Sequence, residues 1–129
     1  MVLSFMLAAD YEKIQKIKYH SQNIQKTLQG ISYDEFVMDE NLDIRDVCAF
    51  RLFQIGEHSN KLSDDFIQNY SDFNWKAAYR FRNIIGHDYD GISYKAIYRS
   101  CKNDNPKLLV YVSQIIEEEN LRRNKSKQD

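Results

Sequence analysis

The stretch from Leu42 to Tyr70, LDIRDVCAFRLFQIGEHSNKLSDDFIQNY, decides the fold. Apolar or small residues recur along it in steps of four and three: Ile44, Cys48, Leu52, Ile55, Ser59, Leu62 and Phe66. This spacing is typical of one buried face of an α-helix. We therefore expect a long helix that begins near residues 41–43 and runs to about Tyr70.

The other side of this expected helix also carries large side chains. At roughly 100° per residue, Phe50, Phe53 and Glu57 fall opposite the main stripe. One apolar stripe needs one packing partner, whereas aromatic residues on a second side indicate another. That partner is a helix of the same domain or a second subunit, and we favour a homodimer interface at Phe50 and Phe53. Along one flank, Arg51, Gln54 and His58 are expected to form a solvated strip, with an inter-subunit groove as the alternative.

The region before this stretch predicts a first long helix and a connector. Apolar residues at helical spacing extend from Leu3 to Leu28, and Gly30 follows. His20 lies off the main stripe, so we expect it to be exposed. Ser32 followed by Glu35 has the form of a capping box, which predicts a short helix over residues 32–39.

The region after this stretch predicts several further helices. Asn74 is a suitable N-cap for a helix from Trp75 to about Ile85, and Gly86 is placed to end it. Ser93 can cap another helix that reaches Cys101. Asn105 followed by Pro106 predicts the start of the last helix.

Composition fits an all-α protein of one domain. The 129 residues include one Pro and four Gly, with 43% hydrophobic and 29% charged residues, and no segment alternates in the manner of a strand. We expect an up-and-down helical bundle of four main helices plus one or two short ones over residues 1–121. Residues 122–129 are charged and are expected to fray.

The sequence also bears on where the protein works. The first nine residues are apolar but run directly into Asp10 and a charged helix, so we interpret them as an early helical turn rather than a signal peptide or membrane span. Cys48 and Cys101 have no metal-type spacing and fit a reduced, cytoplasmic interior. The chain lacks the HExxH, CxxC, P-loop and GxGxxG motifs, which leaves metal hydrolase, NTPase and dinucleotide-binding functions without support.

Chemically reactive residues gather in the run RNIIGHDY from Arg82 to Tyr89. On one continuous helix Arg82 and His87 would diverge by roughly 140°, but a helix end at Gly86 would free His87 to join Arg82. Such a pair combines a phosphate clamp with a group that moves protons near neutral pH, as phosphodiester cleavage without a metal requires. The alternative is that Arg82 caps its helix and His87 is an ordinary loop histidine.

The charge distribution supports a phosphate-binding region. Residues 76–102 contain six cationic and two acidic residues, a net +4, while the remaining chain carries −5. A local positive field of this kind attracts nucleic-acid backbone, although a solvated basic helix face explains it equally well. The candidates for RNA backbone contact are Lys76, Arg80, Lys95 and Arg99.

The same run, Arg82-Asn83-x3-His87-Asp88-Tyr89, resembles the R-x4-H-x-Y motif of HEPN-domain proteins, specifically the HepT type of toxin. Other features are similar to that family: Ile55-Gly56-Glu57 on the long helix, Trp75 seven residues before Arg82, and the connector Ser32 to Phe36. The resemblance covers about Asp10 to Glu119.

This resemblance implies a HEPN-type bundle that cleaves RNA without a metal or other cofactor. The site would be composite, formed where two subunits bring their motifs together, with Arg82 and His87 catalytic and Asn83 in support. Glu57 is a further supporting candidate, because it could hydrogen-bond across a dimer interface or orient Arg82.

The family also implies a partner. HepT-type toxins are paired with an MntA-type nucleotidyltransferase antitoxin, which uses ATP to transfer AMP onto the motif tyrosine, here Tyr89. AMP would add bulk and negative charge two residues from His87 and would compete with RNA phosphate for Arg82. The alternative function is a non-catalytic helical subunit that binds and assists a nucleotidyltransferase.

Overall fold

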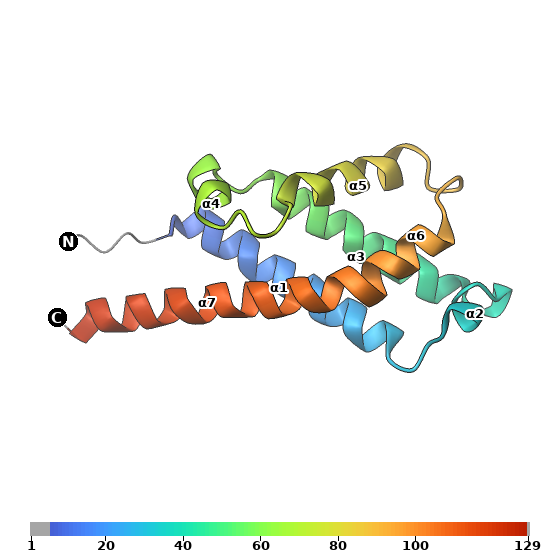
Figure 1. Ribbon diagram of the computed structural model, residues 1–129, viewed down its shortest axis with the longest axis horizontal. Coiled ribbons are helices and arrows are strands. Elements are labelled where there is room, and N and C mark those ends of the chain that lie inside the picture. Colours follow the sequence, from blue (N-terminus) through green and yellow to red (C-terminus); the bar gives the residue numbers. More distant parts are fainter. Residues whose placement is uncertain (1–5, 129) are drawn as a thin grey trace.

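The computed structural model describes residues 6–128, and within that range it contains helices but no strand. Its four main helices are α1 (Ala8–Leu28), α3 (Leu42–Asn60), α5 (Trp75–His87) and α7 (Asn105–Gln128). They run alternately up and down (Figure 1). The shorter elements are α2 (Tyr33–Phe36), the 3-10 turn η1 (Asp39–Asn41), α4 (Asp64–Asn69), α6 (Tyr94–Arg99) and the π-helical turn η2 (Ser100–Asp104). The all-α up-and-down bundle is confirmed, with three short α-helices in the described range.

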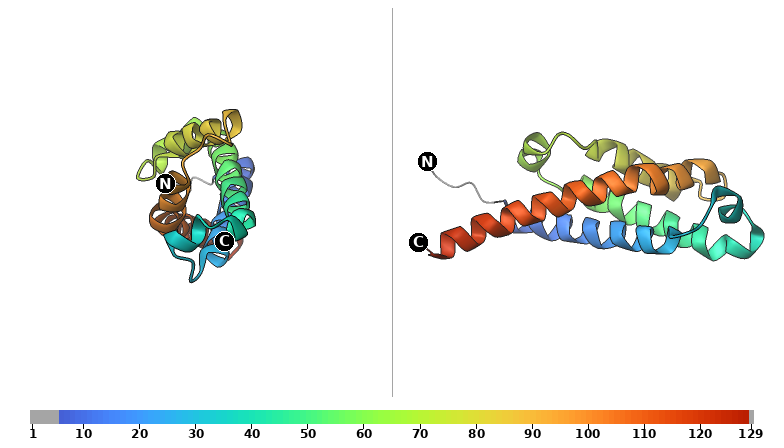
Figure 2. Two further views of the ribbon diagram at one scale, coloured as in Figure 1. Left: turned by 90° about the vertical axis from the view of Figure 1, so that its right-hand side faces the viewer. Right: turned by 60° about the horizontal axis from the view of Figure 1, so that its bottom comes forward.

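Helix α3 is the centre of the bundle. It packs along α1 on one side and α5 on the other, while α7 packs on α1. The end-on view in Figure 2 shows α5 set apart from the α1–α7 pair. The stripe expected from the sequence is confirmed, since Cys48, Ile55, Ser59, Leu62 and Phe66 are buried and Ile44 and Leu52 are half-buried.

The long helix expected over residues 42–70 is two helices. Helix α3 ends at Asn60, and α4 begins at Asp64 after a turn. Ser63 caps α4 by accepting a hydrogen bond from Phe66 N at 3.1 Å. Buried Asp10 of α1 fixes this cap, because its carboxylate accepts from Ser63 N at 2.8 Å and from Ser63 Oγ at 2.6 Å. The apolar period continues through the break, which is why periodicity alone misses it.

The connector between α1 and α3 follows the expected cap chemistry. The Ser32–Glu35 capping box forms, with Glu35 N donating to Ser32 Oγ and Ser32 N donating to Glu35 Oε1. Gly30 adopts the left-handed backbone that ends the preceding helix, with φ at 74°. Helix α1 begins at Ala8, and the expected first residue, Leu3, lies outside the described range.

The last helix was expected to start separately at Asn105 and Pro106, but no break in the helical path precedes it. Helix α6 passes into α7 through η2, in which Asn105 N donates to Ser100 O five residues earlier. A π turn suits this place because Pro106 lacks an N–H and its ring crowds the preceding helical turn. Asn105 is buried and bonded to Ser21 of α1 through both ends of its amide.

The segment expected to fray, residues 122–129, is helical as far as Gln128, and Asp129 lies outside the described residues. Helix α7 continues to Gln128 and extends past the rest of the bundle in Figure 1. Glu119, which is buried, accepts from Met6 N at 2.9 Å and lies 3.5 Å from Arg122 Nε and 3.9 Å from Arg123 Nε. Arg122 and Arg123 also contact other parts of the protein: Arg122 Nη2 donates to the Tyr70 hydroxyl at 3.2 Å, and the Arg123 guanidinium lies 4.0 Å from the centroid of the Tyr11 ring.

His20 is buried rather than exposed, with a relative exposure of 9%. Its Nδ1 lies 3.0 Å from Arg51 Nη1, and its ring stacks on His58 at 5.7 Å between centroids. Burial, followed by the charge of Arg51, lowers the pKa of His20 to about 4, and burial also lowers the pKa of His58. The flank of Arg51, Gln54 and His58 is therefore half-buried, not the solvated strip expected.

These two histidines predict acid sensitivity. When the pKa of a histidine is lower in the folded than in the unfolded protein, folding is stabilised at pH values above the unfolded-state pKa. This stabilisation is lost as the pH falls from the unfolded-state pKa to the folded-state pKa. For His20 the window is from about 6.5 to about 4, and the loss is up to about 3 kcal/mol. Urea unfolding at pH 7 and pH 4.5 should show this difference, and His20→Gln should reduce it. An equal pH dependence in the variant would contradict the assignment.

Candidate functional site

The helix that carries the reactive residues continues past Gly86. Asn74 caps α5 as expected, accepting from Ala77 N at 2.9 Å, but the helix ends at His87 rather than before Gly86. Gly86 lies close to two side chains: a Cβ there would be 3.1 Å from Phe53 Cε2 and 3.3 Å from Arg82 Nη1, so both would have to move by a few tenths of an ångström. The expected helix end at Gly86, which was to free His87, is therefore wrong.

Arg82 is fixed against α3. Its Nε donates to Glu57 Oε1 at 2.5 Å, and its Nη1 donates to Asn83 Oδ1 at 3.2 Å. The guanidinium lies over the ring of Phe53, 4.3 Å from the centroid, a favourable cation–π position. Arg82, Asn83 and Glu57 thus lie together.

Gly56 makes this contact between α3 and α5 possible. A Cβ at Gly56 would lie 2.4 Å from Arg82 Cβ and 2.6 Å from Ala78 O. In the run Ile55-Gly56-Glu57, Ile55 is buried in the core, and Glu57 binds Arg82. Gly56, which has no side chain, lets α5 pack closely on α3. The second partner of α3 at Phe53 is therefore a helix of the same chain, while Phe50 remains 52% exposed.

Arg82 and His87 leave the backbone of α5 in different directions, although the Arg82 guanidinium extends along the helix to 3.3 Å from the place of a Cβ at Gly86. Both residues lie on α5, five positions apart, so they project in directions that differ by roughly 140°. His87 is exposed, whereas Arg82 faces α3. The four basic candidates are also exposed: Lys76 and Arg80 on α5, within roughly 20° of His87 around the helix axis, and Lys95 and Arg99 on α6.

Tyr89 is held by a residue that the sequence did not single out. Its hydroxyl donates to the carboxylate of Asp46 on α3, and its side chain is 40% exposed. Burial, the hydrogen bond to Asp46 and the negative charge of Asp46 raise the pKa of Tyr89 above its ordinary value. No motif or spacing in the sequence pairs residues 46 and 89.

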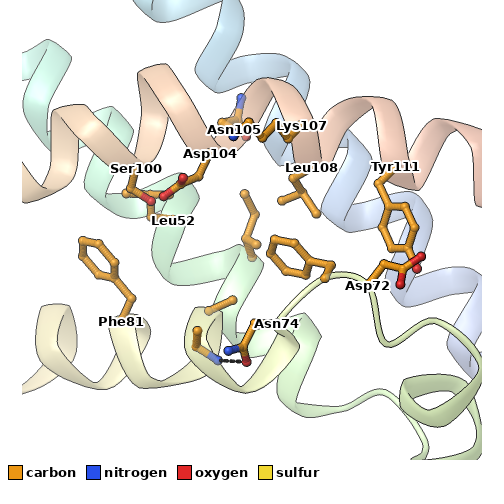
Figure 3. Close-up of a pocket in the computed structure, with 14 residues that line it drawn as sticks. Leu52, Asp72, Asn74, Phe81, Ser100, Asp104, Asn105, Lys107, Leu108 and Tyr111 are labelled. Atoms are coloured by element: carbon orange, nitrogen blue, oxygen red, sulfur yellow. Dashed lines mark hydrogen bonds between the residues drawn. The ribbon is translucent and has the colours of Figure 1, made fainter.

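A cavity of about 520 Å³ lies on the other side of α5, between α5 and α7 with α3 as its floor (Figure 3). Its walls are mostly apolar, with Asp72, Asp104 and Lys107 among its polar lining. Arg82 and His87 do not line it. The cavity is therefore separate from the candidate site.

The described residues, 6–128, were also considered for a metal centre and a membrane-spanning helix. No set of three or more His, Cys, Asp or Glu side chains in that range is arranged to hold a metal ion. Over the same residues, no helix combines the length and apolar character needed to cross a membrane.

Comparison with known proteins identifies the family. The model of the family described as "Ribonuclease HepT-like" matches residues 17–115, which include Glu57 and the run from Arg82 to Tyr89. The chain belongs to the ribonuclease HepT-like family. This confirms the HEPN resemblance and, at the level of the family, the expected ribonuclease activity.

Two curated proteins illustrate the similarity. The chain is 32% identical over 80 residues to Putative RNase MJ1380 of Methanocaldococcus jannaschii, covering 62% of this chain and 72% of that protein. It is 25% identical over 85 residues to Probable ribonuclease HepT of Thermococcus cleftensis, covering 66% and 76%. No solved structure gives a significant match.

Proposed function

We propose that this protein is a metal-independent endoribonuclease whose site is completed by a second copy of the chain. The observation that supports this is that Arg82 and His87 lie five positions apart on one uninterrupted helix, a spacing at which their side chains leave the backbone in directions roughly 140° apart. Arg82 is held at α3 while His87 projects roughly 140° away. A two-fold dimer can place His87 of one protomer beside Arg82 of its partner, since each surface is presented twice.

The residues divide the chemistry as follows. Arg82 supplies a permanent cation for the charge that develops on the phosphate, and Glu57 and Asn83 orient its guanidinium. His87 exchanges the proton of the ribose 2′-hydroxyl or of the leaving oxygen. Lys76, Arg80, Lys95 and Arg99 contact the RNA backbone, and the exposure of all four supports that role.

The protein acts as the toxin of a toxin–antitoxin pair in the cytoplasm. An MntA-type nucleotidyltransferase silences it by transferring AMP from ATP onto Tyr89. The partial exposure of Tyr89 and its place two residues after His87 support this assignment. The added phosphodiester is negatively charged and competes with RNA near the site.

A second function is favoured by one observation. The guanidinium of Arg82 already contacts Glu57, Asn83 and Phe53, as a purely structural residue would. In that case the protein is a non-catalytic subunit that binds a nucleotidyltransferase. Such a protein forms a stable complex with its partner but cleaves no RNA between about pH 5 and pH 8, where an ordinary histidine changes its charge.

The deciding experiment is cleavage of RNA by the purified protein in excess EDTA. We expect cleavage at the same rate with EDTA and with added Mg²⁺, because the proposed chemistry uses Arg82 and His87 alone. Intact RNA under both conditions would reject the ribonuclease function and favour the non-catalytic subunit. Cleavage that requires Mg²⁺ would reject metal independence.

A further inference from the structure

Tyr89 connects the loop after α5 to α3. This loop, residues 88–93, follows His87 directly and leads into α6. The Tyr89 hydroxyl donates a hydrogen bond to the Asp46 carboxylate across the gap between the loop and α3. Asp46 and Glu57, which binds Arg82, belong to the same helix and lie eleven residues apart, roughly 16 Å along its axis and on a similar side of it.

The rest of the loop is a compact turn. Gly91 N donates to Asp88 Oδ1 at 3.1 Å, and Ile92 N donates to Tyr89 O at 3.2 Å. Ile92 is buried in the core, and Ser93 caps α6. The loop is also joined to the last turn of α5, because Asp88 N donates to Ile84 O at 3.1 Å. A contact at Tyr89 is thus linked through two residues of backbone to His87, the last residue of α5.

We propose that Asp46 is a positioning residue for cleavage, which acts through Tyr89 to set the direction in which His87 projects. The proposal rests on the ribonuclease function of His87 proposed above. It adds a residue on α3 that no sequence motif includes, and it gives Tyr89 a role in the unmodified, active protein.

The same contact explains how a group on Tyr89 would act. When Tyr89 Oη bonds to the α-phosphorus of ATP, the Oη–H bond and the bond from that phosphorus to pyrophosphate break. The proton passes to the Asp46 carboxylate, which then releases it to solvent. The modified tyrosine has no donor for Asp46, and its phosphodiester anion faces a carboxylate. The loop therefore loses its attachment to α3, and the end of α5 that carries His87 loses that support.

The test compares Asp46→Ala, Asp46→Asn and Tyr89→Phe with the unmodified wild-type protein. We expect Asp46→Ala and Tyr89→Phe to lower kcat for RNA by about three- to tenfold, the value of one hydrogen bond, with little change in KM. Asp46→Asn keeps an acceptor oxygen and should stay within about twofold of wild type. Asp90→Ala is the matched control, because it removes an exposed carboxylate from the same loop.

A second measurement follows the contact itself. NMR with labelled tyrosine can follow the titration of the Tyr89 phenol. Its pKa should lie above the ordinary tyrosine value in wild type and closer to that ordinary value in Asp46→Ala. If Asp46→Ala and Tyr89→Phe cleave as fast as wild type, or if Asp90→Ala loses as much kcat, the positioning role is wrong. A wild-type protein that cleaves no RNA would instead overturn the underlying function, and unchanged titration in Asp46→Ala would overturn the contact in solution.

Discussion

His87→Ala is expected to lose RNA cleavage by at least about a hundredfold, the usual contribution of a positioned proton-transfer group. The loss should appear in kcat, because His87 is assigned to the chemical step rather than to binding. The side chain is exposed at the end of α5, so its removal opens no cavity. Cleavage assays on the purified variant, with Tm and circular dichroism in parallel, separate the catalytic effect from unfolding.

A basic residue on the same face provides the comparison. Arg80→Ala should raise KM and leave kcat unchanged. Because one phosphate contact is lost, the slope of log K for RNA binding against log salt concentration should become shallower by about one. If His87→Ala retained wild-type kcat with a native fold, His87 would not be the proton-transfer group. If both variants lost only binding, His87 would belong to the RNA-contact surface.

Gly56→Ala, which adds a single methyl group to α3, is expected to destabilise the protein. Alanine gains about 1 kcal/mol of helix propensity over glycine. Its Cβ, however, would lie 2.4 Å from Arg82 Cβ and 2.6 Å from the Ala78 carbonyl, neither of which is a flexible side-chain end. Helix α5 must therefore move away from α3, and we expect the free energy of unfolding to fall by about 2 kcal/mol.

Gly86→Ala is the matched control for this prediction. Its Cβ would meet the edge of the Phe53 ring at 3.1 Å and the Arg82 guanidinium at 3.3 Å, and both groups can shift. The free energy of unfolding should change by less than about 1 kcal/mol. Urea unfolding of both variants checks the pair. Equal stability of Gly56→Ala and wild type would show that α5 does not pack on α3 as described.

Local signals in the sequence predicted much of the fold. The apolar stripe from Ile44 to Phe66 is buried, and the caps at Ser32, Asn74 and Ser93 form as expected. The errors arise where tertiary contacts decide. Asp10 stabilises the cap at Ser63 from α1, and a π turn accommodates Pro106, so neither the break nor the continuous path follows from periodicity.

The sequence singled out candidate site residues, but their arrangement in space did not follow from it. Arg82, His87 and Tyr89 stand out as a motif. For Glu57 two places were open, a dimer interface or Arg82, and it binds Arg82. Gly86 was interpreted as a helix breaker, although α5 continues past it and it lies close to Phe53. No sequence pattern pointed to Asp46, because its hydrogen bond with Tyr89 joins positions 43 residues apart.

Mixing two inactive variants tests the composite site most directly. Arg82→Ala and His87→Ala, unfolded together and refolded at equal concentration, form mixed dimers with one intact pair of Arg82 and His87. If the pair spans two protomers, the mixture should recover about a quarter of wild-type cleavage in EDTA, since half the dimers are mixed and each has one of two sites. If mixed dimers form and the mixture remains as inactive as either variant alone, the site does not span two protomers.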